Sequence, residues 1–486
     1  MGIKNLKNKI IPIMIVLLLG NNSAIAIENV SIEKNAILNI KDCIELALKN
    51  SPAVKKAKYN YGLAKNNVTI SKSAFFPTIG IGTGYYAAQN ATSNSLMRNG
   101  NINYYSAEAS IQQLIFDFGK TNADIKMNKF NMITALYNFD YTVLETIFGV
   151  KTNYYGVLAA KASVDINKAN VQINERNYQR TKAYFEEGIK SKIDLVNAEV
   201  NLSDSKVSLV EAEKSYQNAL VKLNNSMYIA FAPEYEIENT ETFNFTSNYA
   251  PVNLEKISES KDISAPPKDV NNAFLTSQVQ KIDVLQDYKF EPFPYTFEEA
   301  VKIAYKNRPD LKAFDSTLSA MKEALKYTKR AYLPELSARG GYGYRDTNNT
   351  NSFNVSLNLS TSLNILSTKK EIDNAKIQVD IAQNEIDLTK QDIYFAVQDA
   401  YINMKQLEKQ IPLIAVKVKQ TLENFELADG RYAVGIGDYI QLQDAKVNYN
   451  NAQHEYVQTV YNYNVARANL EKAMALPQTV TITIED

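Results

Sequence analysis

The side chains best suited to covalent or metal chemistry are almost missing from this chain. It contains one cysteine, Cys43, and one histidine, His454. A single cysteine cannot form a disulfide within the chain, and this pair cannot supply a structural zinc site. His454 falls among polar neighbours in a predicted helix, which favours a solvated or inter-helix position over catalysis. Cys43 falls in a short predicted helix, where a small core residue is expected rather than a reactive thiolate.

Short motifs for binding phosphates, dinucleotides or catalytic zinc are also missing from the sequence. Gly80, Gly82 and Gly84 alternate with other residues but open no helix, so we interpret them as strand glycines. The chain has 53 basic and 53 acidic side chains, and this neutrality argues against a nucleic-acid-binding face. We therefore expect no enzymatic activity, no cofactor, no metal and no nucleic-acid partner.

The N-terminus has the layout of a secretory signal. Lysines at positions 4, 7 and 9 precede an apolar run over 10–19, and a small-x-small sequence ends at Ala26. The run is shorter than the ~20 residues that cross a bilayer as a helix. We therefore predict a signal peptide over 1–26 rather than a membrane anchor. No later apolar run is long enough to cross as a helix, so an exported protein that enters a membrane must do so as β-strands.

The rest of the chain is an internal duplication. Residues 46–52 (LALKNSP) correspond to 303–309 (IAYKNRP), and later matches follow in the same order. The largest difference in length falls between the polar segments 88–102 and 345–351, which is typical of a surface loop between two copies of one unit. The predicted domains are a first repeat (27–228), a proline-rich linker (229–294), a second repeat (295–477) and a C-terminal tail (478–486).

Each repeat opens with helices and then changes its period. Thr296 and Glu299 form a predicted capping box, and Pro52 and Pro309 suit the first position of a second helix. After a further proline in each repeat, apolar residues alternate with polar ones, which predicts strands with one apolar and one polar face. The predicted strands are 77–88, 103–116, 334–345 and 352–366.

Two interpretations of these strands compete, a soluble half-buried hairpin and a transmembrane barrel hairpin. Their length of about ten residues or more, with tyrosines near the loop ends, favours the barrel, as does the export signal. Four strands cannot close a pore, and lipid does not tolerate open sheet edges. Several copies must therefore share one barrel, and three chains would give about twelve strands.

Long helices fill the remainder of each repeat. They are predicted at 119–187, 191–225, 369–430 and 438–473, with hairpin turns at Gly188 and Gly435 and a kink at Pro412. The helix after each turn has a heptad seam that alternates large and small residues. Such a seam suits a packed wall of many helices better than an isolated two-helix coil.

Three motifs recur in the two repeats. Asn-x-Pro occurs at 50–52 and 307–309, a Leu-x-Phe-Asp-x-Gly-Lys sequence occurs at 114–120, and 363–369 is a degraded version of it. Arg431-Tyr-Ala-Val-Gly is followed by Gln441, whereas the first repeat keeps Asp194-Leu-Val after its turn. The ordered set resembles the TolC family of outer-membrane efflux proteins over nearly the whole chain after the signal.

The resemblance implies an α+β membrane protein. Four strands per chain would contribute to a 12-stranded barrel of a homotrimer in outer-membrane lipid, above a periplasmic tunnel of long helices. It implies passive conduction in a tripartite efflux or type I secretion system, with a periplasmic adaptor and an inner-membrane transporter as partners. The alternative is a periplasmic coiled-coil adaptor or scaffold without its own pore, which should lack two equivalent strand pairs.

The resemblance also places functional residues at the hairpin tips. Asp444 matches a carboxylate of a cation-selective gate, Gln441 replaces a second one, and Asp438 is placed to compensate. For Asp438, Asp444 and Asp194 the alternative is an ordinary helix-start acid that complements the helix dipole. The residues expected to contact the adaptor are Gly188, Ser191, Arg431, Tyr432 and Gly435.

Overall fold

The computed structural model describes residues 32–90, 100–238, 293–346, 350–362 and 364–477. The predicted signal peptide, the C-terminal tail and most of the predicted linker lie outside the described residues.

Both repeats contain the same elements in the same order, as the duplication predicts. The first repeat has α1 (Ile40–Asn50), α2 (Pro52–Ser73), β2 (Thr78–Asn90), β3 (Gly100–Phe116), α3 (Lys120–Glu186) and α4 (Lys192–Ser226). The second has α6 (Phe297–Asn307), α7 (Pro309–Arg330), β5 (Glu335–Arg345), β6 (Thr350–Ser360), α8 (Ile365–Ala433) and α9 (Tyr439–Ala473). Two short strands, β1 (Ile37–Leu38) and β4 (Glu236–Ile237), pair in parallel.

Local side-chain contacts explain where the helices begin. The predicted capping box at Thr296 and Glu299 is present, and Pro52 and Pro309 occupy the first positions of α2 and α7. Before α3, the Asp117 carboxylate accepts hydrogen bonds from the amides of Gly119 (3.0 Å) and Thr121 (2.6 Å). Asp117 therefore satisfies an amide in the first turn of α3, whose N-cap residue, Gly119, has no side chain to do so.

The boundary between β6 and α8 differs from the sequence prediction. We expected a strand to 366 and a helix from 369, but β6 ends at Ser360 and α8 begins at Ile365. The Asn364 side chain caps α8 by accepting a hydrogen bond from the Ser367 amide at 3.2 Å. A cap fixes the start of a helix more strongly than the apolar alternation that continues through Ile365.

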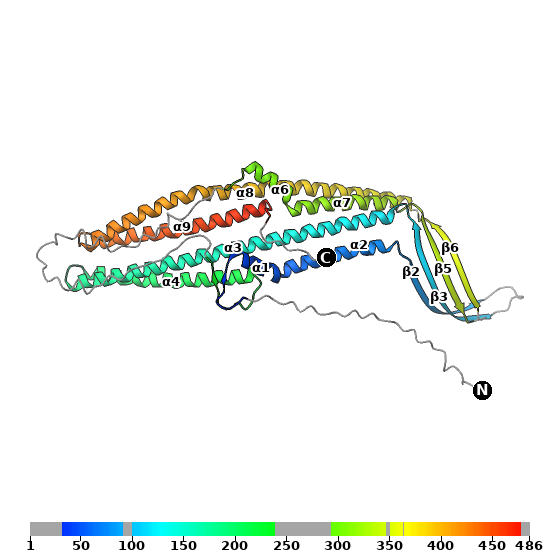
Figure 1. The fold of residues 1–486 in the computed structure, drawn as a ribbon, viewed down its shortest axis with the longest axis horizontal. Coiled ribbons are helices and arrows are strands. Elements are labelled where there is room, and N and C mark those ends of the chain that lie inside the picture. Colours follow the sequence, from blue (N-terminus) through cyan, green and yellow to red (C-terminus); the bar gives the residue numbers. More distant parts are fainter. Residues whose placement is uncertain (1–31, 91–99, 239–292, 347–349, 363, 478–486) are drawn as a thin grey trace, which may run out of the picture.

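The molecule is a long rod of helices with a curved sheet at one end (Figure 1). Helices α3 and α8 have 67 and 69 residues, so each is about 100 Å long. Near the sheet, packing contacts give the order α2–α3–α7–α8, and towards the other end α4–α3–α9–α8. The chain thus forms a single-layered wall of helices. Helix α8 runs through Pro412, and the kink expected there stays a prediction.

The core lies along the seams between these helices. The predicted seam residues of α4 and α9 are largely buried, with Leu223, Leu442 and Leu470 at most 1% exposed, which confirms the heptad interpretation. Among the described residues, none of the helices combines the length and the apolar character needed to cross a membrane.

Candidate functional site

The four-stranded sheet has its apolar face exposed. The antiparallel order is β2-β3-β5-β6, and paired residues place the same alternation on every strand. Ile81, Phe353 and Leu357 are 73–78% exposed on one face, whereas the other face carries small and polar residues such as Ser337 and Gly341. A contiguous exposed apolar face that extends over four strands indicates a surface that contacts lipid or another protein. A soluble half-buried hairpin would need a helix or another element to cover this face. Within the described residues, no helix packs on it.

The polar face of the sheet carries few large side chains. Glu108 and Arg339 form an ion pair across β3 and β5 at 3.0 Å. Nearer the loop end, the Tyr86 and Tyr104 rings stack with centroids 5.1 Å apart, and the Arg345 guanidinium lies 5.1 Å from the Tyr104 ring centre. The remaining positions are mostly glycine, serine and asparagine.

Both predicted hairpin turns are present at the far end of the rod. Gly188 and Gly435 have φ angles of 75° and 79°, a left-handed conformation that favours glycine. A third glycine was not singled out from the sequence. Gly437 is buried, and a Cβ on it would lie 2.6 Å from the Tyr432 amide nitrogen, so only glycine fits there.

The four polar gate candidates occupy different environments. Asp194 forms a capping box with Ser191, whose amide and hydroxyl donate to its carboxylate at 3.1 and 2.8 Å. Its contacts are those of the helix-start alternative. Asp438 is the exposed N-cap of α9 and makes no side-chain capping bond. Gln441 and Asp444 follow on α9, and both are exposed.

Tyr432 does not present its side chain to solvent. Its ring is completely buried, and its hydroxyl shares a 2.9 Å hydrogen bond with the Thr181 hydroxyl. The tyrosine thus packs between the two hairpins in this structure, and its contact with an adaptor stays a prediction. Gly188, Ser191, Arg431 and Gly435 are exposed.

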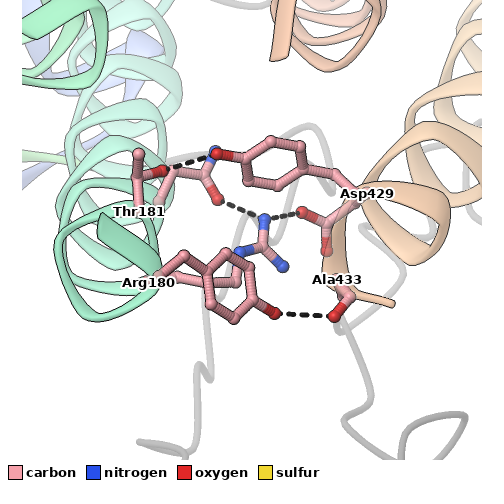
Figure 2. A network of polar contacts seen from close by, with 7 residues as sticks. Arg180, Thr181, Asp429 and Ala433 are labelled. Carbon is pink, nitrogen blue, oxygen red and sulfur yellow. Dashed lines mark hydrogen bonds and ion pairs between the residues drawn. The ribbon is translucent and has the colours of Figure 1, made fainter. Parts of the chain in front are cut away.

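A cluster of contacts joins the end of α3 to the end of α8, and we call it the tip clamp (Figure 2). Its members are Arg180, Thr181, Tyr184, Asp429, Tyr432 and Ala433. Arg180 donates to Asp429 at 2.5 Å and to Asn177 at 2.9 Å. The Tyr184 hydroxyl donates to the Ala433 carbonyl at 2.6 Å. Figure 2 shows these contacts between the two helices: Arg180 reaches Asp429, the Thr181 hydroxyl meets the Tyr432 hydroxyl, and the Tyr184 hydroxyl reaches the Ala433 carbonyl.

The tip clamp combines charge with aromatic contact. Both side chains of the Arg180–Asp429 pair are only about one-fifth exposed (19% and 22%), which limits screening by solvent. The Arg180 guanidinium and the Lys190 ammonium lie 5.1 and 4.9 Å from the Tyr432 ring centre, within the range of cation–π attraction. Burial raises the pKa of Tyr432, so its hydroxyl stays protonated.

A buried lysine lies further along the same helices. Lys446 on α9 is 2% exposed and donates to Asn174 on α3 and to Gln443. Gln443 in turn donates to Asn201 on α4, and Asn201 donates to the Tyr439 hydroxyl, each at 2.8 Å. Burial lowers the pKa of the Lys446 ammonium to about 8. This chain of amides links three helices across the seam.

The residues first considered for chemistry take structural places. Cys43 is completely buried, and burial raises the pKa of its thiol to about 12. His454 is half-buried, and burial lowers its pKa. In the part of the chain that the structure describes, no three His, Cys, Asp or Glu side chains lie close enough to hold a metal ion.

Neither the tip clamp nor the Lys446 network could be identified from the sequence. Arg180 and Asp429 are 249 positions apart, and the duplication gives no signal for them, because the corresponding positions of the other repeat carry leucine and lysine. Contacts that break the internal symmetry need the folded arrangement to be recognised.

Comparisons with known proteins place this architecture. The model of the outer membrane efflux protein family matches residues 43–227 and 300–476. The fold is similar to the Campylobacter jejuni CmeC outer membrane channel (16% identity, 90% of this chain and 85% of that chain, TM-score 0.69). It is also similar to VceC from Vibrio cholerae (13% identity, 90% of this chain and 95% of that chain, TM-score 0.68). A third similar structure is the MtrE outer membrane channel of Neisseria gonorrhoeae (15% identity, 90% of this chain and 88% of that chain, TM-score 0.65). Among curated proteins, no match was found.

Proposed function

This chain belongs to the outer membrane efflux protein family, and from that premise we propose that it is the outer-membrane channel of a tripartite efflux or type I secretion system. The observation that carries the proposal is a sheet with an exposed apolar face at one end of a wall of helices about 100 Å long. A pore-less periplasmic adaptor has no need of such a sheet. The strands lie in the outer membrane, and the helices form a tunnel in the periplasm.

The two edges of the chain support assembly with further copies. Strands β2 and β6 are the edges of the sheet, and open edges are not stable in lipid. Exposed apolar residues follow the edge helices with helical spacing. They are Ile193, Val196, Val200, Val207, Val210 and Val221 on α4, and Ile381, Leu388, Phe395, Ile402 and Val416 on α8.

These two apolar stripes lie on the side of each helix opposite its buried residues, because about 3.6 residues complete a turn. A helix with apolar stripes on two opposite sides is suited to a position between two neighbours in a wall. We infer that α8 of one copy packs against the opposite edge of the next copy, which is α4 towards the hairpin tips and α2 nearer the sheet. Three copies then close a barrel of about twelve strands, an even number within the usual range.

The proposed mechanism is passive conduction with a gate at the hairpin tips. The chain performs no bond chemistry in this mechanism, and cargo moves along the gradient that an inner-membrane transporter maintains. The tip clamp holds the two hairpins together, so opening requires the ends of α3 and α8 to shift relative to each other. A periplasmic adaptor would bias that shift by contacting Gly188, Ser191, Arg431 and Gly435, which are exposed at the turns.

Charge at the gate is proposed to rest mainly on Asp444. It is exposed on α9 near the turn, whereas Gln441 contributes no charge. Asp438 is the second candidate because its carboxylate makes no capping bond. Asp194 is the weakest candidate, since its carboxylate is engaged by Ser191.

The proposal is tested by fractionation and conductance. The full chain is expressed in a Gram-negative host, and membranes are separated and extracted with detergent. We expect a trimer in the outer-membrane fraction that dissociates on heating and conducts ions in planar bilayers. A monomer that is soluble without detergent, or a trimer without conductance, would contradict the proposal.

A further inference from the structure

Charged side chains are few and unevenly placed on the polar face of the sheet. Among the side chains described on the four strands, this face carries four charges, on Glu108, Glu335, Arg339 and Arg345. Glu108 and Arg339 neutralise each other as an ion pair at 3.0 Å. Glu335 begins strand β5 at the end next to the helices, and Arg345 ends the same strand at the loop end. Ten residues of strand separate the last two by about 30 Å.

Arg345 is held in place by aromatic rings. Its guanidinium lies 5.1 Å from the centre of the Tyr104 ring, and Tyr104 stacks on Tyr86. Cation–π attraction to a ring does not neutralise a guanidinium, so its positive charge and N–H donors can still attract a carboxylate or phosphate. Arg345 takes part in none of the ion pairs between described residues. The neighbouring Asp346 carries a negative charge, but its carboxylate accepts a hydrogen bond from the Tyr105 amide at 2.7 Å and does not pair with Arg345.

We propose that Arg345, supported by Tyr104 and Tyr86, attracts anions at the outer end of the barrel lumen and favours the passage of cargo that carries a carboxylate or phosphate. The inference rests on the proposed function, because the polar face becomes a lumen only in the assembled barrel. Three copies bring three such arginines around one opening. The distance from Arg345 to Glu335 far exceeds a screening length of about 8 Å, so the negative charge of Glu335 does not offset them. Charges at a narrow opening with low-dielectric walls raise the local concentration of counter-ions.

A single tryptophan can report on this position, because the chain contains none. Tyr104→Trp places an indole beneath Arg345, and tryptophan binds a cation at least as well as tyrosine does. The detergent-extracted trimer is inserted into lipid nanodiscs, and indole fluorescence is quenched with iodide and with neutral acrylamide. Acrylamide quenching reports how accessible the indole is, so the ratio of the iodide to the acrylamide quenching constant reports the attraction of anions to this position.

The comparison is made between Arg345→Gln and Arg345→Lys on the Tyr104→Trp background. One positive charge about 5 Å away concentrates a monovalent anion roughly two- to fourfold, depending on salt. Arg345→Gln should lower the iodide-to-acrylamide ratio by that factor, whereas Arg345→Lys should retain most of it. An unchanged ratio in Arg345→Gln would overturn the proposal.

A second reporter tests the assignment of the two faces. Tyr105 is adjacent to Tyr104 but lies on the apolar face, 64% exposed in the isolated chain. Tyr105→Trp should be shielded by lipid from iodide and should not respond to Arg345→Gln. Quenching at 105 but not at 104 would refute the placement of Arg345 in the lumen. Conductance of the same preparation reports the channel itself, so failure of the proposed function is seen separately.

Discussion

Arg180 connects two helices that are 249 positions apart in the chain, and its removal tests whether the tip clamp resists opening. A charge-assisted pair that is mostly shielded from solvent contributes about 1 kcal/mol or more. Arg180→Ala and Asp429→Ala should each raise open probability in planar bilayers by about fivefold, since 1.4 kcal/mol is tenfold. The double variant should add little, because both changes remove one interaction.

An exposed ion pair provides the matched control for the clamp. Lys206 and Glu175 are 3.9 Å apart and 60% and 45% exposed, so Lys206→Ala should leave conductance unchanged. Full additivity of the two clamp substitutions would show that Arg180 and Asp429 do not act together.

Asp444 is predicted to attract cations to the gate. Its carboxylate is exposed near the turn, so Asp444→Ala should raise leak conductance or weaken the preference for cations, measured as reversal potential in a salt gradient. Asp194→Ala is the contrasting variant. It should lower thermal stability by about 1 kcal/mol through loss of the cap and leave ion preference unaltered. Wild-type conductance and ion preference in Asp444→Ala would remove this residue from the gate.

Lys446 predicts a dependence of stability on pH. Burial lowers its pKa from 10.5 to about 8 in the folded chain, so the unfolded chain binds more protons between pH 8 and 10. Stability therefore rises with pH in this window, by roughly 2 to 3 kcal/mol. Thermal unfolding in detergent, followed by circular dichroism, should show this rise, and Lys446→Met should abolish it. If stability rises equally with pH in the wild type and in Lys446→Met, the lowered pKa of Lys446 is contradicted.

At the scale of elements, the two hairpin turns depend on left-handed glycines. A β-branched residue at a positive φ costs about 1 kcal/mol or more. Gly188→Val and Gly435→Val should therefore distort the turns and reduce copurification with the adaptor. Gly430 is the control, because it is helical, lies close to the same turn, and a Cβ added to it would have no neighbouring atom within 4 Å. Gly430→Ala should preserve copurification. Equal losses of copurification in all three variants would show that the positive φ of Gly188 and Gly435 is not the cause.

Most elements could be predicted from the sequence because each has a local cause. Pro52 and Pro309 start helices, Thr296 and Glu299 cap one, and a period of two marks each strand. The prediction erred at Asn364, where capping overrides a continuing apolar alternation. It also missed the burial of Tyr432 and the partners of Arg180 and Lys446, because these contacts join segments that are distant in the chain.

At the scale of the whole molecule, assembly depends on the apolar edges. Phe395 lies in the stripe of α8 and is 55% exposed in the isolated chain. In the proposed trimer it is covered by the next copy, and an unpaired charge there costs several kcal/mol. Phe395→Lys should therefore shift the detergent-extracted protein from trimer to monomer in size-exclusion chromatography with light scattering.

The neighbouring residue separates this effect from general destabilisation. Ala396 is exposed but lies outside the stripe, so Ala396→Lys should remain trimeric. If Phe395→Lys is as fully trimeric as Ala396→Lys, the stripe of α8 is not the seam between copies.

The two turns of one chain are unlike. One begins its following helix with the Ser191–Asp194 capping box, whereas the other passes through the buried Gly437 to an Asp438 that makes no capping bond. The ring of tips in the assembled channel therefore alternates between two kinds of docking position. A partner that recognises backbone shared by both kinds has six places to bind, and one that requires the capped turn has three. The stoichiometry of the complex would thus reveal which turn its partner reads.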